Sequence, residues 1–300
     1  MNKELFFSTI VFLIIALIMA VSFSDAAISQ DNTDVVSSSQ YSDAVIPDEE
    51  TVEVQSNISS ESNKDTDSNK SYLAIIMDDI GYGKENKYNI FERLYGFKIT
   101  FSIIPGTYNA LKAEETAVNS GFDIMAHLPM QAKGIDNSYE KAIRTDMSHE
   151  DLYKRIEEMF SKFKYVKGAN NHMGSKATSD KKTMLTLMTY LKKRNMFFVD
   201  SLTTSDSVVK EVAGLLEMDY LARDIFLDNQ TKPEYIKDQL EKACRIANKK
   251  KVAIAICHVR ENTINVLESD LQRILDKYDV ELINISELYV NKKKFNLVAR

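Results

Sequence analysis

The chain has 300 residues, of which 44% are hydrophobic and 27% are charged, and its formal net charge is −6. These proportions are typical of globular proteins and exclude collagen-like, fully disordered and purely coiled-coil chains. Only one segment is long and apolar enough to cross a bilayer, so a multi-span membrane protein is excluded as well. Two cysteines, Cys244 and Cys257, cannot form a disulfide framework. No strongly basic domain is present, so nucleic acid is not an expected partner.

The first 70 residues divide into an apolar leader and an acidic linker. Residues 5–23 form a run of 19 uncharged residues, which is long for the hydrophobic region of a signal peptide and short for a membrane span. We therefore interpret residues 1–23 as a signal peptide or an N-terminal membrane anchor. Residues 24–70 hold 11 acidic, 2 basic and 11 serine residues, a composition typical of a disordered segment. Both interpretations of the leader place the rest of the chain outside the cytoplasm, in the periplasm or another extracytoplasmic compartment.

From residue 71 onwards, short apolar runs alternate with longer amphipathic segments. The runs are continuous, as in strands buried on both faces of a sheet. They cover residues 73–77, 98–104, 122–126, 164–169, 196–199, 224–227, 252–257 and 280–285. Regular alternation of strands and helices predicts a parallel sheet covered by helices. Seven or eight such units favour one α/β domain over residues 71–300, a (β/α) barrel of seven to eight parallel strands. An open doubly wound sheet is the alternative.

Three helices are predicted because apolar residues recur at helical spacing. They cover residues 148–164, 180–194 and 232–248. Ser148 and Asp151 form a capping box at the start of the first helix. The third helix has Thr231 as its expected N-cap and Pro233 in its first turn. Cys244 lies on its apolar face and is expected in the core.

Chemically active side chains follow several of the predicted strands. In a barrel of this kind, functional groups lie at the carboxyl ends of the strands. Three of the four histidines and two consecutive aspartates stand at such ends: His127, His172, His258, Asp78 and Asp79. The fourth histidine, His149, falls in the first turn of a predicted helix and is expected on the surface. Cys257 lies on an apolar strand and is expected to be buried.

This pattern predicts a metal-assisted site. Zinc and similar cations are bound by imidazole nitrogens and carboxylates, and a catalytic site keeps one position open for water. Asp79, His127 and His172 would supply two imidazoles and one carboxylate. Successive side chains of an extended strand point to opposite faces, but the first strand is expected to end at Asp78, where the chain turns. One aspartate could then bind metal while the other accepts a proton. A structural role is the alternative for each histidine taken alone.

The strand-end segments resemble the polysaccharide deacetylase superfamily, and within it the divergent polysaccharide deacetylases of bacterial exported proteins. Seven segments carry the resemblance, which covers roughly residues 71–290: IIMDDIGYG (75–83), ITFSIIPGT (99–107), IMAHLPMQ (124–131), GANNHMGSKAT (168–178), FFVDSLTT (197–204), RDIFLDN (223–229) and AIAICHVR (253–260). The chain lacks the Gly-x-Ser-x-Gly motif of serine hydrolases and the Walker A and Gly-x-Gly-x-x-Gly motifs of nucleotide-binding proteins. The resemblance implies a distorted (β/α) barrel that hydrolyses an N- or O-acetyl group on a carbohydrate with the help of a metal.

The resemblance also implies roles for single residues. Position by position, Asp78 corresponds to the catalytic base, Asp79 and His127 to metal ligands, and His258 to the group that protonates the leaving group. The family usually has a second metal histidine four residues after the first, where this chain has Gln131. His172 is the candidate that replaces this ligand from the next strand.

Three functions are compatible with these residues. The first is a deacetylase of an envelope or extracellular polysaccharide, with zinc as the expected metal. Its substrate site would be lined by Asn171, Asp200, Ser201, Arg223 and Asp228. The second is a glycosidase that pairs Asp78 with Asp200 or Asp228 and needs no metal. The third is a non-catalytic envelope protein that binds a glycan or a protein partner on the same face.

Overall fold

The computed structural model of the protein describes residues 70–82, 89–135 and 141–291. They belong to one compact unit, Asn63–Arg300. The predicted leader, residues 1–23, and the predicted linker up to residue 69 lie outside the described residues. Within the described ranges, no helix has the length and apolar character that a membrane span requires.

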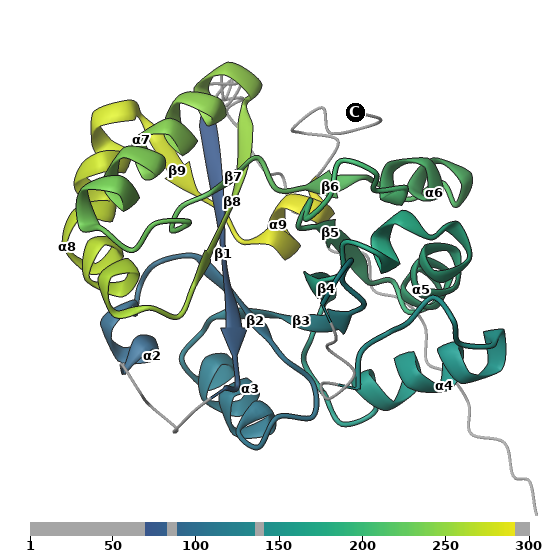
Figure 1. The fold of residues 1–300 in the computed structure, drawn as a ribbon. Coiled ribbons are helices and arrows are strands. Elements are labelled where there is room, and N and C mark those ends of the chain that lie inside the picture. The colour runs from purple at the N-terminus through teal and green to yellow at the C-terminus, as the bar shows by residue number, and fades with distance from the viewer. Residues whose placement is uncertain (1–69, 83–88, 136–140, 292–300) are drawn as a thin grey trace, which may run out of the picture. The chain divides into compact units, whose positions relative to one another are not determined.

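A parallel sheet forms the centre of the domain (Figure 1). Its strands are β1 (Ser71–Ile80), β2 (Ile99–Ile103), β3 (Asp123–Met130), β4 (Gly168–Met173), β5 (Phe197–Asp200), β6 (Leu221–Ala222), β7 (Ile225–Phe226), β8 (Val252–His258) and β9 (Val280–Leu282). Neighbouring strands follow the order β6-β5-β4-β3-β2-β1-β8-β7, and β9 pairs with β1. Each pairing between these strands is parallel, as predicted.

One short segment joins the two ends of the sheet. β6 pairs with β5, and β7, two residues further on, pairs with β8. Between them, the Arg223 N–H donates to the Asp200 carbonyl at 2.9 Å and the Asp224 N–H donates to the Ile254 carbonyl at 2.8 Å. The segment therefore passes from one edge of the sheet to the other. The sheet curves into a distorted (β/α) barrel, which confirms the predicted fold class.

The helices lie around the outside of the strands, except α9, which lies between β1 and β5 in the view of Figure 1 and packs its Ile285 and Leu288 with Ala74 and Ile76 of β1. The helices are α2 (Ile90–Arg93), α3 (Ala110–Asn119), α4 (His149–Phe160), α5 (Lys181–Lys193), α6 (Val209–Leu215), α7 (Pro233–Lys250), α8 (Glu261–Tyr278) and α9 (Ile285–Val290). The three predicted helices correspond to α4, α5 and α7. Ser148 caps α4, because its Oγ accepts a hydrogen bond from the Asp151 N–H at 3.1 Å. Thr231 as the cap of α7 was wrong by one residue, since Lys232 is the N-cap and Pro233 begins the helix.

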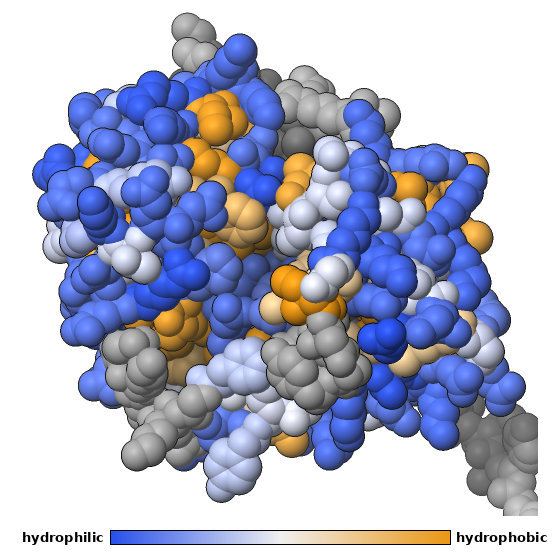
Figure 2. Space-filling view, in the orientation of Figure 1, coloured by the Kyte–Doolittle hydropathy of each residue, from blue (hydrophilic) through white to orange (hydrophobic). Residues whose placement is uncertain are grey.

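Alternate side chains of the inner strands belong to two hydrophobic clusters. On β1, Leu73 and Ile75 belong to the larger cluster, which includes the buried faces of the helices. Ala74 and Ile76 belong to a second cluster, which fills the barrel interior. Both faces of the strand are therefore buried, which explains the continuous apolar runs. The opposite, outward sides of the helices give the molecule a mainly hydrophilic face (Figure 2).

Candidate metal and catalytic site

Polar side chains occupy the interior-facing positions at the carboxyl ends of five adjacent strands. The interior face of β1 carries Ala74 and Ile76 before Asp78, and that of β8 carries Ile254 and Ile256 before His258. The pairing register places these groups side by side: His258 with Asp78, and His127 with Asn170. The row across the sheet is His258 on β8, Asp78 on β1, Ser102 on β2, His127 on β3 and Asn170 on β4. The barrel interior thus changes from apolar to polar at one level.

Both consecutive aspartates contribute to this site because β1 is irregular there. The register between β1 and β2 shifts between Met77 and Ile80, and Asp79 has a φ of 66°. The strand continues to Ile80, so the prediction that it ends at Asp78 was wrong. A bulge turns Asp79 towards the histidines instead. A left-handed residue with a side chain costs about 1–2 kcal/mol, and such strain is concentrated at functional sites.

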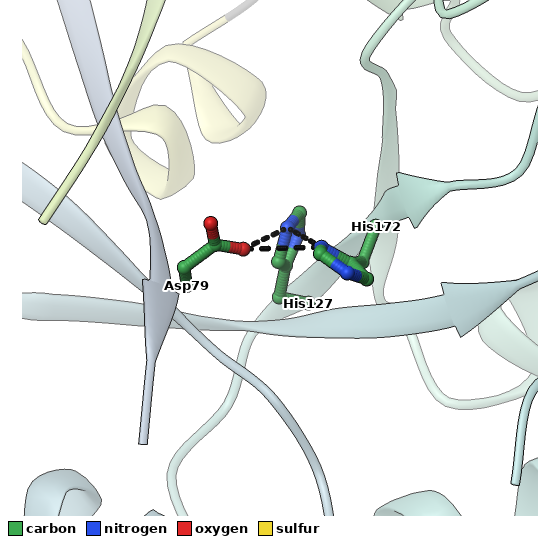
Figure 3. Close-up of side chains that lie close together, drawn as sticks. All are labelled: Asp79, His127 and His172. Atoms are coloured by element: carbon green, nitrogen blue, oxygen red, sulfur yellow. Dashed lines mark hydrogen bonds and ion pairs between the residues drawn. The ribbon is translucent and has the colours of Figure 1, made fainter. Parts of the chain in front are cut away.

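Three side chains from β1, β3 and β4 converge on one point (Figure 3). Asp79 Oδ1 lies 3.3 Å from His127 Nε2 and 3.0 Å from His172 Nδ1, and the two nitrogens are 3.1 Å apart. In the described part of the chain, Asp79 Oδ1 is buried and accepts no well-directed hydrogen bond. Potential ligand atoms from all three lie within 4.8 Å of one another. Such atoms, close together but poorly satisfied by one another, fit a small divalent cation.

The cluster is protected on one side and open on the other. The side chain of His127 is 3% exposed, whereas those of His172 and Asp79 are 15% and 32% exposed. Burial by itself raises the pKa of Asp79, but contacts with His127 and His172 hold it well below its usual range. Asp79 is therefore ionised, as a metal ligand must be. A catalytic metal site needs an open side for water or substrate, and this cluster has one.

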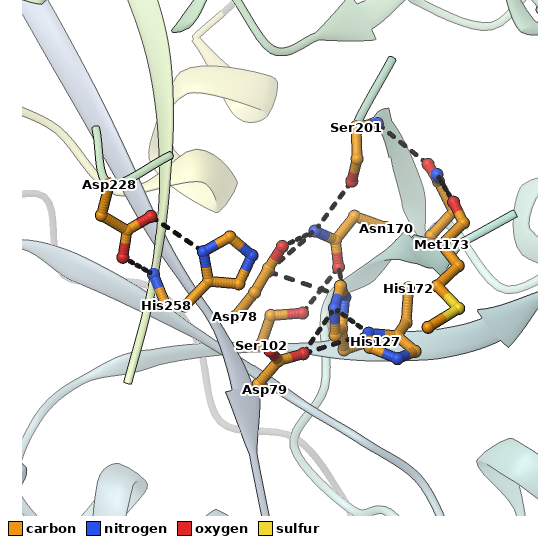
Figure 4. A network of polar contacts seen from close by, with 11 residues as sticks. Asp78, Asp79, Ser102, His127, Asn170, His172, Met173, Ser201, Asp228 and His258 are labelled. Atoms are coloured by element: carbon orange, nitrogen blue, oxygen red, sulfur yellow. Dashed lines mark hydrogen bonds and ion pairs between the residues drawn. The ribbon is translucent and has the colours of Figure 1, made fainter. Parts of the chain in front are cut away.

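A buried network centred on Asn170 lies behind the cluster (Figure 4). Asn170 Nδ2 donates to both carboxylate oxygens of Asp78, at 2.9 and 3.1 Å. Asn170 Oδ1 accepts from Ser102 Oγ at 2.6 Å and faces His127 Nδ1 at 2.8 Å. Asn170 was not among the predicted site residues. Strand alternation could have identified it, because Asn170 and His172 share one face of β4 while Asn171 faces the other way.

Asp78 and His258 have the pKa shifts expected of a base and an acid. Burial raises the pKa of Asp78 above its usual value, although His127 and Asn170 oppose the shift. Burial alone would lower the pKa of His258, but its hydrogen bond to Asp228 raises it overall. Nδ1 of His258 lies 2.8 Å from Asp228 Oδ1. A raised pKa makes Asp78 a stronger base and keeps His258 protonated to a higher pH, so both directions suit these roles.

Several residues predicted to bind substrate have internal partners instead. Asn171 is 1% exposed, and its Oδ1 accepts from the Ser201 N–H at 2.9 Å while its Nδ2 donates to the Met173 carbonyl at 2.7 Å. Asp200 is fully buried and accepts from the Leu202 N–H at 2.9 Å. These side chains shape the loops after β4 and β5. In this structure they are not placed to touch a substrate.

Of the other predicted rim residues, Asp228 contacts His258 directly and Arg223 lies over a ring that stacks on it. Asp228 is fully buried and accepts from Thr263 as well as from His258. Neither it nor Asp200 is therefore available as the second carboxylate of a glycosidase. Arg223 is partly exposed. It donates to the Ser201 carbonyl at 2.8 Å, and its guanidinium lies 3.8 Å from the ring centre of Phe226, which stacks on His258. Substrate contacts of Ser201 and Arg223 stay predictions.

Gln131 does not belong to the metal cluster. Its Oε1 accepts from the backbone N–H and the hydroxyl of Thr145, both at 3.0 Å, so it holds the segment after β3. His172 lies beside Asp79 and His127 in the cluster, and its role as a metal ligand stays a prediction. His149 is exposed, and both cysteines are buried, as predicted. His127 and His172 lie within β3 and β4 rather than after them, because both strands run beyond their apolar runs.

A parallel (β/α) barrel with an aspartate–histidine cluster at its strand ends defines a protein of the polysaccharide deacetylase type. The chain belongs to the divergent polysaccharide deacetylase family, whose sequence profile matches residues 75–289. An uncharacterised protein of Haemophilus influenzae is 34% identical over 224 residues, which cover 75% of this chain and 79% of that protein. The uncharacterised protein YibQ of Escherichia coli is 29% identical over 216 residues, or 72% of this chain and 66% of its own length.

Solved structures share the fold. An uncharacterised protein of Agrobacterium tumefaciens superimposes with a TM-score of 0.67 and 16% identity, covering 73% of this chain and 89% of that one. A putative cellobiose-phosphate cleavage protein of Enterococcus faecalis has a TM-score of 0.54 and 15% identity, covering 73% of this chain and 99% of that one. At these identities the likeness concerns the barrel alone.

Proposed function

We propose that the protein is a metal-dependent deacetylase that removes acetyl groups from an envelope or extracellular polysaccharide. The observation that carries the proposal is the convergence of Asp79, His127 and His172 beside Asp78 and His258. This arrangement combines a metal-binding cluster with a candidate base and a candidate acid at one level of the barrel. Membership of the divergent polysaccharide deacetylase family supports the choice of reaction and of a carbohydrate substrate.

The metal would be held by Asp79, His127 and His172. Two imidazoles and one carboxylate suit zinc, which prefers nitrogen and oxygen ligands in a catalytic site with an open position. When bound, such a cation lowers the pKa of a water molecule and polarises the acetyl carbonyl. The open side of the cluster, at Asp79 and His172, is where the acetyl group would lie.

The remaining chemistry follows from two side chains on β1 and β8. Asp78 accepts a proton from the attacking water, whose oxygen forms a bond to the acetyl carbon. His258, kept protonated by Asp228, donates a proton to the sugar nitrogen or oxygen as its bond to the acetyl group breaks. The products are acetate and a free amine or hydroxyl on the sugar. Asp78 and His258 are register partners on adjacent strands, so both can reach one acetyl group.

We also propose that the protein is exported. The support is the uncharged run over residues 5–23 followed by the acidic, serine-rich segment of residues 24–70. An export signal or anchor would bring the barrel to the compartment where envelope polysaccharides are found. Whether residues 5–23 act as a cleaved signal or as an anchor does not alter the proposed chemistry.

Acetate release from N-acetylated and O-acetylated polysaccharides tests the proposed reaction. We expect release by the zinc-loaded protein and by His149→Ala, which changes a surface histidine away from the site. Asp78→Asn should be about 10²- to 10⁴-fold slower, the usual contribution of a general base. If the zinc-loaded wild-type protein binds these glycans but releases no acetate from any of them, deacetylation is refuted. The non-catalytic, glycan-binding function would then replace it.

A further inference from the structure

We infer that Asn170 is a positioning residue whose single amide group fixes the tautomer of His127 and the orientation of Asp78 together. The inference deepens the proposed function, because His127 is a proposed metal ligand and Asp78 the proposed base. It concerns hydrogen bonds that exist in the protein without a metal. Its test can therefore succeed or fail separately from the test for acetate release.

The orientation of the Asn170 amide follows from its neighbours. Asn170 is fully buried, and its Nδ2 lies 2.9 and 3.1 Å from the two oxygens of Asp78. An amide NH₂ group only donates and a carboxylate only accepts. The opposite orientation would set the amide oxygen against a carboxylate and the NH₂ group against the Ser102 hydroxyl and a ring nitrogen. The carboxylate thus decides which way the amide points.

This orientation decides which nitrogen of His127 carries the proton. Asn170 Oδ1 lies 2.8 Å from His127 Nδ1, so Nδ1 must be the donor. A neutral imidazole has only one N–H, which leaves Nε2 with a free lone pair. Nε2 is the atom that faces Asp79 and His172, at 3.3 and 3.1 Å. Asn170 therefore presents His127 to the cluster in the form that binds a metal.

The same amide couples the two halves of the site. His127 Nδ1 lies 3.6 Å from Asp78 Oδ1, which is beyond hydrogen-bond distance, so Asn170 and not Asp78 is the acceptor that this nitrogen faces. Asn170 contacts both groups: its Nδ2 donates to Asp78, and its Oδ1 accepts from His127 Nδ1. Ser102 Oγ, at 2.6 Å, gives Oδ1 a second donor. Its removal leaves the bond to His127 in place, so Ser102 is expected to matter less than Asn170.

Two substitutions of Asn170 separate its effect on the His127 tautomer from its effect on Asp78. Asn170→Leu has a similar size and removes both polar ends, so it should abolish the preference for the Nδ1–H tautomer. It should also weaken zinc binding about 10- to 100-fold, the usual effect of removing a group that orients a metal ligand. Asn170→Asp keeps an oxygen for the His127 N–H but places another oxygen against Asp78. It should keep the tautomer and slow acetate release.

The tautomer is measured by long-range ¹H–¹⁵N correlation of the histidine rings in the metal-free, full-length protein at alkaline pH, and zinc affinity by competition with a chelator. Asn119→Leu, the same change at an exposed position on α3, is the control and should leave both unchanged. Circular dichroism reports whether each variant is folded. If Asn170→Leu does not fold, the His127 tautomers in Asn170→Asp and Ser102→Ala test the inference instead. Both variants should keep the Nδ1–H form of His127.

The results distinguish the inference from the proposed function. A wild-type protein that shows Nε2–H on His127, or a folded Asn170→Leu protein with unchanged tautomer and zinc affinity, overturns the inference. Loss of the Nδ1–H form in Asn170→Asp overturns it too. A wild-type protein that binds no zinc refutes the proposed function. The ring spectra of its metal-free form still decide the role of Asn170.

Discussion

Replacing Gly81 by alanine is expected to destabilise the protein strongly, for two separable reasons. Gly81 has a φ of +104°, and an added Cβ would lie 2.3 Å from Thr107 Oγ1. The backbone conformation costs about 1–2 kcal/mol for a residue with a Cβ. Displacing Thr107 costs about 1–3 kcal/mol more, as other overpacking changes do. The expected loss is about 2–5 kcal/mol, and each kcal/mol lowers Tm by about 2–4 °C in a domain of this size.

Gly121→Ala is the matched control. Gly121 also has a positive φ, +79°, but an added Cβ there would meet no atom within 4 Å, so only the conformational cost applies. Urea unfolding followed by circular dichroism gives the difference between the two variants, which isolates the clash. Adding Thr107→Ala should recover the clash part of the loss in Gly81→Ala. Equal losses at positions 81 and 121, with no recovery from Thr107→Ala, would refute this reasoning.

Three further predictions concern the site and the leader. Zinc at about 100 times its Kd should add about 2.7 kcal/mol to the free energy of unfolding, with the gain lost in His172→Ala and kept in His149→Ala; an unchanged gain in His172→Ala would contradict the ligand assignment. Asp228→Asn should lower the pKa of His258, whose raised value depends on their hydrogen bond against the effect of burial. The alkaline limit of acetate release should then move to lower pH, and an unmoved limit would exclude His258 as the acid. Cell fractionation should find the native protein outside the cytoplasm because of residues 5–23, and soluble cytoplasmic full-length protein would contradict export.

The linkage of His258 to stability has a definite sign. Its pKa in the folded protein lies above its usual value, so its contribution to stability is complete below the unfolded-state pKa. The contribution is lost as the pH rises through the folded-state pKa. Asp228→Asn should remove this part of the pH dependence. Equilibrium unfolding at several pH values, for the wild-type and variant proteins, measures it.

The sequence predicted the barrel well because most inner strands are buried on both faces. Continuous apolar runs marked β1, β2, β5 and β8, and the order of strands and helices implied parallel pairing. The same criterion placed the ends of β3 and β4 four residues too early, since their later residues face the polar end of the barrel interior. The short β6 was missed for a different reason. It has only two residues, too few to produce a pattern.

The clustering of Asp79, His127 and His172 was predictable from the sequence, whereas the hydrogen-bond network behind them was only partly predictable. Histidines are rare in this chain, so three at strand ends stood out. Asn170 is one of two consecutive asparagines, and composition alone does not say which one faces the interior. Its role depends on Asp78, 92 positions earlier in the chain, and on the bulge that separates the directions of Asp78 and Asp79. Such contacts depend on the three-dimensional register of the strands.

The position of β1 in the sheet affects the order in which the site can assemble. β1 pairs with β2, which follows it in the chain, but also with β8 and β9 near the other end, where Ser71 is the register partner of Val280. Such distant pairings slow folding, because a long loop must close before they form. As the chain is synthesised from its N-terminus, the three proposed metal ligands emerge by residue 173, and His258 only much later. One edge of β1 stays unpaired until then, an exposed template for pairing with other chains. The acid half of the site is therefore completed by the same late step that protects this edge.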